Sequence, residues 1–286
     1  MSYIRFGLMI LVSTVLMFVL MYLNTYAWEH IFFSETRAYM AMLMGATMAV
    51  IMLSFMLGMY SNTKLNIAIF AASIAVFAFS LWLVRSQVTV SGTSYMRAMI
   101  PHHSIAVMTS ERAQIRDARV GKLADEIIAA QRREIAEMRY LIADVTGGNI
   151  VQGVYEDPPA KLGTVEDALG NTLISTLDLS PISPTEADQI LPAGTRCTFH
   201  RSRESDPILW VAQGDNEGAM KLNGVLVSLG ARGETDSGGI AFATPGIKVT
   251  MNPLATEADW RSNAELLFVL DAGLSVGYRG FWSCSG

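Results

Sequence analysis

The stretch "LNIAIFAASIAVFAFSLWLV", residues 65–84, contains twenty residues and no charged side chain. A helix needs about 20 apolar residues to cross the hydrocarbon core of a bilayer, so this stretch is long enough to span one. Two earlier stretches, 6–28 and 38–63, are also free of charge and at least as long. The first of them exceeds the apolar run of about 7–15 residues that is typical of a signal peptide. The sequence therefore predicts a region of three transmembrane helices over residues 1–88.

Charged residues between the spans indicate how the protein is oriented in the membrane. Arg5 precedes the first predicted span and Lys64 lies between the second and third, so both lie on one side. The loop 29–37, with two glutamates and one arginine, lies on the other side. Because positive residues favour the cytoplasmic side, the N-terminus is expected in the cytoplasm and everything after Arg85 outside it. The expected location is the bacterial inner membrane, with the C-terminal part in the periplasm and the lipid bilayer as a partner.

Residues 89–146 are expected to form a helical hairpin. Its helices cover about 94–116 and about 120–145, and apolar residues recur every three or four positions in the second. Residues 94–145 hold eight Lys and Arg against seven Asp and Glu, so this segment has almost no net charge. A nearly neutral segment offers no basic surface, and nucleic acid is therefore not an expected partner.

The first hairpin helix carries "AMIPHHSIAVM", residues 98–108, where two of the chain's four histidines stand between two methionines. Met99 and either His102 or His103 share one face of a helix, because residues three or four apart lie on the same side. Pro101 inside a helix removes one backbone donor and bends the chain beside the histidines. This stretch is therefore a candidate metal site.

The second hairpin helix has Glu134 and Met138 on a face that is otherwise apolar. Burying an ionisable group is costly unless the group is paired or binds a metal. Imidazole and thioether ligands favour Cu(I), whereas a glutamate in place of a methionine suits a harder ion such as iron or zinc. The alternative is a buried ion pair between glutamate and histidine, with the methionines filling gaps in the core. The residues alone leave both interpretations open.

The segments "YMRAMIPHHSIAVM" and "LADEIIAAQRREIAEMRYLI" resemble the family catalogued as domain of unknown function 305, over about residues 94–145. Its members share a "MIPHHxxAixM" first helix and a "QxxEIxxM" second helix. The resemblance implies a ferritin-like helical bundle, and some members are periplasmic copper-binding proteins. The metal ligands that it implies are Met99, His102, His103, Met108, Glu134 and Met138. Because one hairpin is half of a four-helix bundle, a homo-oligomer formed through the hairpin is expected.

Methionines also recur every four residues along the second predicted span, at Met40, Met44, Met48, Met52 and Met56. Four residues at about 100° each overshoot a full turn by about 40°, so these side chains form a ridge that winds part way round the helix. The ridge has two interpretations: it handles metal with soft sulfur ligands, or it consists of flexible apolar residues that pack or face lipid.

The chain beyond residue 146 differs in composition and hydrophobic pattern from the helical part. Residues 147–190 are rich in turn signals and proline and are expected to be a linker. Residues 191–286 contain short strand-like runs separated by turns, which predicts an all-β barrel or sandwich. These runs are "TRCTFH", "PILWVA", "AMKLN", "VLVSLG", "GIAFAT", "IKVTM", "ELLFVLD" and "LSVGYRGFWSC". Residues 146–286 hold 17 Asp and Glu against nine Lys and Arg, so the β-module is acidic.

The chain has two cysteines, Cys197 and Cys284, and both lie in the portion expected outside the cytoplasm. An even pair in an oxidising compartment favours a disulfide, which here would join the first strand of the β-module to the last. The alternative is a pair of buried thiols.

Together these features favour a membrane-anchored, periplasm-facing protein that binds a transition metal, copper first, in envelope metal homeostasis or tolerance. The alternative is a structural or interaction protein whose β-module binds a periplasmic partner. No nucleophile, base and acid stand in a recognised catalytic motif, so no enzymatic activity is expected.

Overall fold

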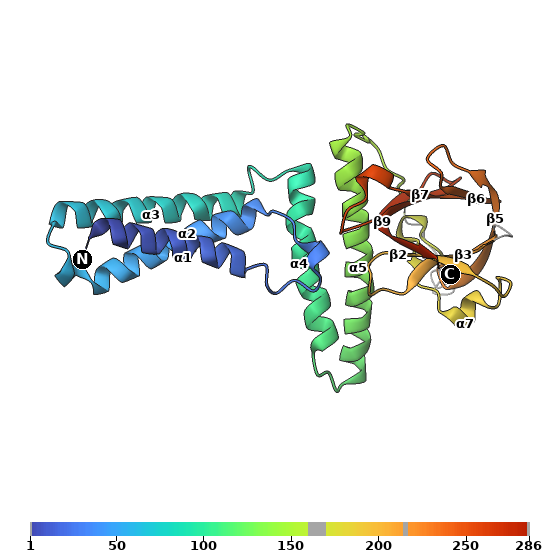
Figure 1. The fold of residues 1–286 in the computed structure, drawn as a ribbon, viewed down its shortest axis with the longest axis horizontal. Coiled ribbons are helices and arrows are strands. Elements are labelled where there is room, and N and C mark those ends of the chain that lie inside the picture. Colours follow the sequence, from blue (N-terminus) through green and yellow to red (C-terminus); the bar gives the residue numbers. More distant parts are fainter. Residues whose placement is uncertain (1, 160–169, 214–216, 285–286) are drawn as a thin grey trace. The chain divides into compact units, whose positions relative to one another are not determined.

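The computed structural model describes residues 2–159, 170–213 and 217–284 of the protein. The chain divides into two compact units, Met1–Ile128 and Ala129–Gly286, and the boundary falls within one long helix. The first unit is helical and the second contains the strands (Figure 1).

Three helices of the first unit are long and apolar enough to cross a membrane: α1 (Tyr3–Leu20), α2 (Glu35–Phe55) and α3 (Thr63–Ser86). The three predicted apolar helices are thus confirmed. Short 3-10 turns stand in the two connections: η1 (Trp28–His30) and η2 (Leu57–Met59). Each long helix begins at a polar side chain that accepts a hydrogen bond from a backbone N–H of its first turn. These capping residues are Ser2, Ser34 and Asn62.

Helix α2 packs against both α1 and α3. At Gly45 the approach to α1 is so close that an added Cβ would overlap the hydroxyl of Thr14. Further along α2, Leu53 is fully buried in an apolar cluster, and Met52 and Met56 pack against the same cluster. Met40, by contrast, is 43% exposed. The methionine ridge is therefore not one continuous surface, and its last two members pack within the bundle.

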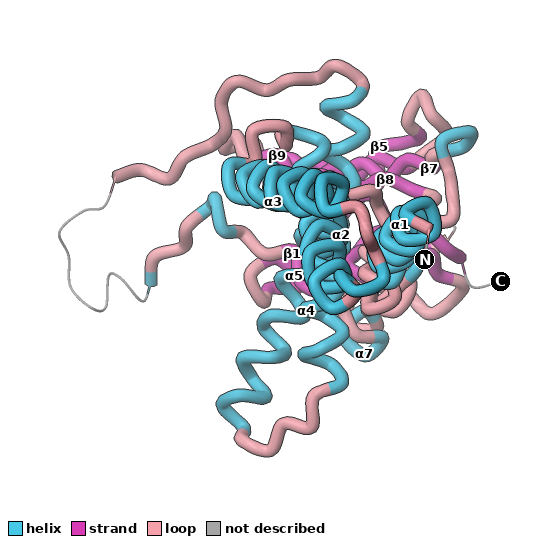
Figure 2. The backbone as a smooth tube through the Cα atoms, turned by 90° about the vertical axis from the view of Figure 1, so that its left-hand side faces the viewer, coloured by secondary structure: helices cyan, strands magenta, loops and turns pink. Residues whose placement is uncertain are grey.

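Two further helices follow, α4 (Gly92–Arg112) and α5 (Ala118–Thr146), and both agree with the predicted hairpin helices to within a few residues. Helix α4 continues without a break across Pro101. Within the first unit, α4 lies crosswise at the end of the bundle where α1 ends and α2 begins (Figure 1, Figure 2).

The second unit contains a closed antiparallel barrel whose strands are β2 (Arg196–His200), β3 (Pro207–Ala212), β4 (Glu217–Leu222), β5 (Val225–Glu234), β6 (Ile240–Thr244), β7 (Ile247–Pro253), β8 (Ala264–Leu270) and β9 (Ser275–Cys284). Each strand pairs with the next one along the chain, and β9 returns to pair with β2. Every predicted strand-like run becomes a strand, and this ring of pairings decides for a barrel over a sandwich. A further short strand, β1 (Leu179–Ser180), pairs with the end of β4. Two 3-10 turns lie outside the barrel strands: η3 (Ile174–Thr176) and η4 (Ala255–Glu257).

A disulfide joins Cys197 to Cys284, as predicted. The two cysteines lie opposite each other in the pairing of β2 with β9, so the disulfide crosses the seam at which the barrel closes. Large apolar side chains from most strands fill one buried core, among them Phe199, Leu209, Met220, Phe242, Val249 and Phe268. A barrel of about eight strands has an interior just wide enough for such side chains, so this barrel is a packed core.

The segment before the barrel, predicted as a linker over 147–190, is partly structured. Residues 160–169 of it lie outside the described residues. Beyond them, β1 pairs with the barrel, and a second apolar cluster joins this segment to β3 and β4. The buried members of that cluster are Ile182, Ala187, Leu191, Ala212 and Ala219. The end of the predicted linker is therefore packed on the barrel.

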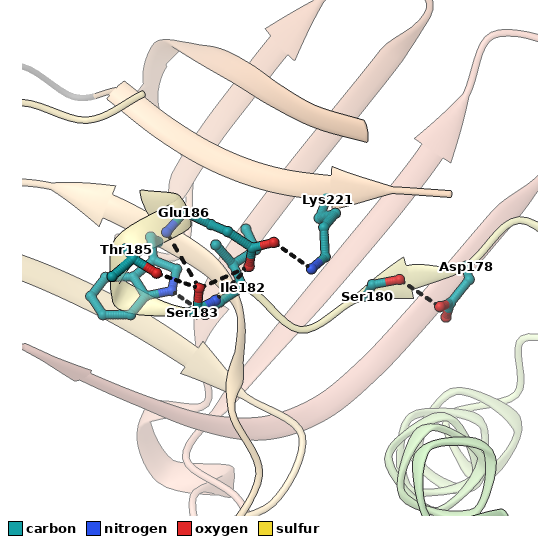
Figure 3. Close-up of polar contacts among 8 residues, drawn as sticks. Asp178, Ser180, Ile182, Ser183, Thr185, Glu186 and Lys221 are labelled. Carbon is teal, nitrogen blue, oxygen red and sulfur yellow. Dashed lines mark hydrogen bonds and ion pairs between the residues drawn. The ribbon is translucent and has the colours of Figure 1, made fainter. Parts of the chain in front are cut away.

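A short helix in this segment, α7 (Pro184–Ala187), is held by the polar contacts that Figure 3 shows. The backbone N–H of Ser183 donates to Glu186 at 2.9 Å, and the backbone N–H of Glu186 donates back to the Ser183 hydroxyl at 3.3 Å. This reciprocal cap stabilises the helix start. Lys221 of β4 donates to the other Glu186 oxygen at 2.9 Å and so links α7 to the barrel.

Candidate functional site

Helix α4 carries a fully buried polar residue, Ser104. Its hydroxyl accepts a hydrogen bond of 2.8 Å from the backbone N–H of Tyr26. The same hydroxyl is hydrogen-bonded to Nδ1 of His30 at 2.9 Å, and the His30 side chain is only 1% exposed. Because Tyr26 and His30 belong to the connection between α1 and α2, the Ser104 face of α4 points toward that connection.

The predicted ligands on α4 lie at different angles from this face. At about 100° per residue, His103 lies about 100° from Ser104, Met99 about 140° and His102 about 200°. The His102 ring is exposed, and its centroid lies 6.0 Å from that of the His103 ring. Met108, however, lies only about 40° from Ser104. Helix α4 therefore groups Met99 with the two histidines and places Met108 near the bundle side.

The second half of α5 packs against the barrel within the second unit. Ala136 is fully buried in the barrel's core cluster. The ring of Tyr140 lies so close to Gly277 of β9 that a Cβ there would overlap it. Arg133 forms an ion pair of 3.2 Å with Asp178. The barrel therefore covers the face of α5 that carries Arg133, Ala136 and Tyr140.

The predicted ligands on α5 lie on the opposite face. Glu134 and Met138 are each two residues from Ala136 and thus about 200° round the helix from it. Gln131, one turn before Glu134, donates a long hydrogen bond of 3.5 Å from its amide to the Glu134 carboxylate. Docking on the barrel thus leaves Glu134 half-buried on the side of α5 away from Ala136, whereas Met138 on that side is itself buried, at 9% exposed.

A polar cluster lies between α5 and the barrel, and no motif in the sequence predicts it. Arg201 follows β2, is 4% exposed, and donates to the backbone carbonyl of Leu179. Its guanidinium also lies 4.8 Å from the centroid of the Tyr278 ring, another buried group. Burial raises the pKa of Glu137, while the nearby Arg133 and Arg201 act to lower it. The sequence around Arg201 does not indicate that this arginine is buried. The one local signal for the cluster is the inward position of Tyr278 on an alternating strand.

The donor chemistry of the predicted residues fits a soft ion. Imidazole nitrogen with thioether sulfur selects Cu(I) among the biological metals. In the part of the chain that the structure describes, no group of three or more His, Cys, Asp or Glu side chains is placed to hold a metal ion.

Comparison with known proteins places this site in a recognised region. Residues 87–179 match the family model described as domain of unknown function (DUF305). Residues 145–286 match the model described as domain of unknown function (DUF6692). An uncharacterised protein of Acanthamoeba polyphaga mimivirus is 31% identical over 106 residues, which cover 36% of this chain and 68% of that protein. No solved structure matches the chain.

Proposed function

The chain belongs, through residues 87–179, to the family described as domain of unknown function (DUF305), and we propose that it is a membrane-anchored metal-binding protein. The proposed ion is copper, and the proposed role is envelope metal homeostasis or tolerance by binding rather than by catalysis. The proposed ligands are Met99, His102, His103, Met108, Glu134 and Met138.

The observation that supports this proposal most is the placement of these residues on their helices. On α4, Ser104 faces the bundle, and Met99 and His102 lie more than a third of a turn away from it. On α5, the barrel covers the Ala136 face, and Glu134 lies on the opposite side. The packing contacts of Ser104 and Ala136 thus point in other directions than Met99, His102 and Glu134, whereas Met138 is itself buried. Met108 is the weakest member of the set because it lies near the Ser104 direction.

The proposed location outside the cytoplasm rests on the arrangement of the bundle. Tyr3 at the start of α1 donates from its hydroxyl to Asn66 of α3 at 2.8 Å, so Arg5 and Lys64 lie at the same end. Helix α4 lies at the other end. Because positive residues favour the cytoplasmic side, α4 is proposed to face the periplasm of a bacterial inner membrane. A membrane-impermeant maleimide applied to spheroplasts should label Arg112→Cys and spare Lys64→Cys, and the reverse pattern would invert the orientation.

The test of metal binding is a titration of the purified full-length protein in detergent with Cu(I) against a competing chelator. We expect stoichiometric binding by the native protein. The double variant His102→Gln/His103→Gln should bind at least about tenfold more weakly, a loss of about 1.4 kcal/mol or more. Weaker binding by Glu134→Gln or Met138→Leu would extend the ligand set to α5.

A matched control is His200→Gln, which also removes an imidazole. Both ring nitrogens of His200 have partners in the barrel, the Ser205 carbonyl at 2.7 Å and the Thr198 hydroxyl at 2.9 Å. Its copper affinity should equal that of the native protein. If the native protein binds no Cu(I), the metal proposal fails, and the alternative of an interaction protein with a periplasmic partner for its barrel is favoured.

One two-helix segment supplies half of the helices of a four-helix bundle, so we propose that two chains associate through it. Light scattering of the detergent-solubilised protein should give the mass of at least two chains, and a monomer at all concentrations would exclude this association.

A further inference from the structure

The connection between α1 and α2 is an ordered platform at one end of the bundle. The backbone N–H of Ser34 donates to the hydroxyl of Tyr22 at 3.0 Å, and both residues are buried. Arg37 lies with its guanidinium 4.4 Å above the Tyr22 ring and donates to the backbone carbonyl of Met21. These contacts tie the two ends of the connection together, so the residues between them are held in place.

Helix α4 rests on this platform through Ser104. The hydroxyl is hydrogen-bonded to the backbone N–H of Tyr26 and to the ring of His30; the contact with His30 is buried and the contact with Tyr26 is partly buried. Ile100 and Val107, one turn before and after Ser104 on the same face, are also fully buried. A buried polar group that loses its partner costs about 1–3 kcal/mol, so this contact favours one rotation of α4 over its alternatives.

That rotation matters because His103 is the residue next to Ser104. If α4 rotated about its axis by the angle between successive residues, every side chain would move by about 100°. The imidazole of His103 would then point elsewhere, and another side chain would take its place. Metal ligands must be held close to their productive geometry by surrounding packing and hydrogen bonds. The contact between His30 and Ser104 is thus in a position to control where the histidine pair points.

We propose that His30 is a positioning residue that, through Ser104, fixes the rotation of α4 and thereby sets the copper affinity of the His102–His103 pair from the transmembrane bundle. This inference rests on the proposed metal-binding function. His30 does not itself bind the metal in this proposal; it acts through the hydroxyl of Ser104.

The experiment uses the full-length protein in detergent and makes two measurements on each variant. The first is Cu(I) affinity. The second is the distance distribution between spin labels at Ser86→Cys in α3 and Arg112→Cys in α4, both exposed positions, recorded without metal. Ser104→Ala and His30→Leu remove the contact. Ser104→Thr keeps the hydroxyl, and His30→Asn keeps a hydrogen-bonding group near the position of Nδ1.

We expect Ser104→Ala and His30→Leu to broaden the distance distribution and to lower copper affinity about tenfold, within the range typical for residues that support metal ligands. Ser104→Thr and His30→Asn should retain both properties of the native protein. Circular dichroism of each variant should show unchanged helix content, which separates loss of positioning from loss of folding.

Three results would overturn the inference, and each is distinct. An unchanged distance distribution in Ser104→Ala and His30→Leu means that the contact does not set the rotation of α4. A broadened distribution with native copper affinity means that rotation does not control the site. Equal loss of affinity in His30→Asn and His30→Leu means that the imidazole is itself a ligand. Absence of copper binding by the native protein would instead defeat the proposed function, while the distance measurement would still report on the contact.

Discussion

At the scale of single residues, the barrel unit contains two glutamates in opposite electrostatic situations. Glu137 of α5 lies in the polar cluster with Arg201, and burial raises the pKa of its carboxyl above the ordinary value of 4.5. Glu186 of α7 accepts hydrogen bonds from the Ser183 backbone and from Lys221, and these lower its pKa to about 2. Folding therefore favours the protonated form of one carboxyl and the charged form of the other.

The two glutamates should give opposite pH dependences of stability. Because the folded protein holds the Glu137 proton more tightly than the unfolded chain does, stability from this group is lost as the pH rises from about 4.5 through its raised pKa. The free energy of unfolding of Glu137→Gln, relative to the native protein, should therefore increase over that window. Urea unfolding of the barrel, followed by near-ultraviolet circular dichroism at a series of pH values, measures this difference.

Glu186→Gln is the matched control with the opposite sign. The stability that Glu186 contributes is present above its ordinary pKa and is lost as the pH falls toward about 2. This variant should therefore be less stable than the native protein near neutral pH and equal to it in strong acid. Parallel pH profiles for both variants and the native protein would contradict the assignment of these two environments.

At the scale of elements, close approach decides which residues a helix can carry. Buried small residues, Ala41, Gly45 and Ala49, follow each other every four positions along α2. Small residues at this spacing let helix backbones approach closely in a membrane. At Gly45 the backbone of α2 lies so close to Thr14 of α1 that an added Cβ would overlap the threonine hydroxyl. The same device recurs in the barrel unit, where Gly277 admits the ring of Tyr140 from α5.

Two glycine-to-alanine variants in the predicted spans should therefore change the stability of the helical bundle in different directions. An alanine favours a helix over glycine by about 1 kcal/mol, and Gly7 has open space around it, so Gly7→Ala should be neutral or stabilising. Gly45→Ala should destabilise the bundle despite the same helical preference, because its Cβ overlaps Thr14. Thermal loss of helical circular dichroism in detergent measures both. Restoration of stability in Gly45→Ala by Thr14→Ala would identify the overlap as the cause, whereas equal melting of the two single variants would refute it.

At the scale of the whole molecule, two compact units are built on different principles. The first consists of helices whose exposed apolar sides suit a membrane, and the second consists of a barrel closed on itself. The disulfide belongs to the second unit alone. It joins residues separated by 87 positions, so it encloses most of the barrel in one covalent loop.

Removal of the disulfide should destabilise the barrel and spare the bundle. For a loop of 87 residues the chain-entropy model assigns about 4–5 kcal/mol to the cross-link. The variant Cys197→Ala/Cys284→Ala should show a barrel transition, followed by near-ultraviolet circular dichroism, at much lower urea. The thermal loss of helix from the spans should not change. A common shift of both transitions would show that the units unfold together.

Local patterns specified the elements of this protein. Charge-free runs of sufficient length marked the three long apolar helices, and the apolar period marked α5. Short strand-like runs separated by turn signals marked every barrel strand from β2 to β9. Such patterns are readable because helix and strand periodicity depend on neighbours in the chain. The pairing of Cys197 with Cys284 also followed from the sequence, since the two cysteines nearly bracket the strand-rich stretch.

The sequence predicted which residues form the candidate site. It did not predict which way their side chains point from α4 and α5. Spacing along α4 grouped Met99 with the histidines, but it did not reveal that Ser104 faces the bundle and that Met108 lies close to that side. Nor did the sequence indicate that Ala136 and Tyr140 would dock on the barrel and leave Glu134 opposite. These facts depend on which distant residues, such as His30 and Gly277, come to lie beside each helix.

The sequence by itself thus determined the three apolar helices, the two helices that follow and the β-module, and it favoured the disulfide over a pair of thiols. Only the tertiary structure decided that the strands close into a barrel, that Arg201 is buried beneath α5, and which face of α4 and α5 is engaged in packing. The physical reason is that periodicity and composition act between near neighbours. Closure, burial and helix rotation are set by contacts between residues far apart in the chain.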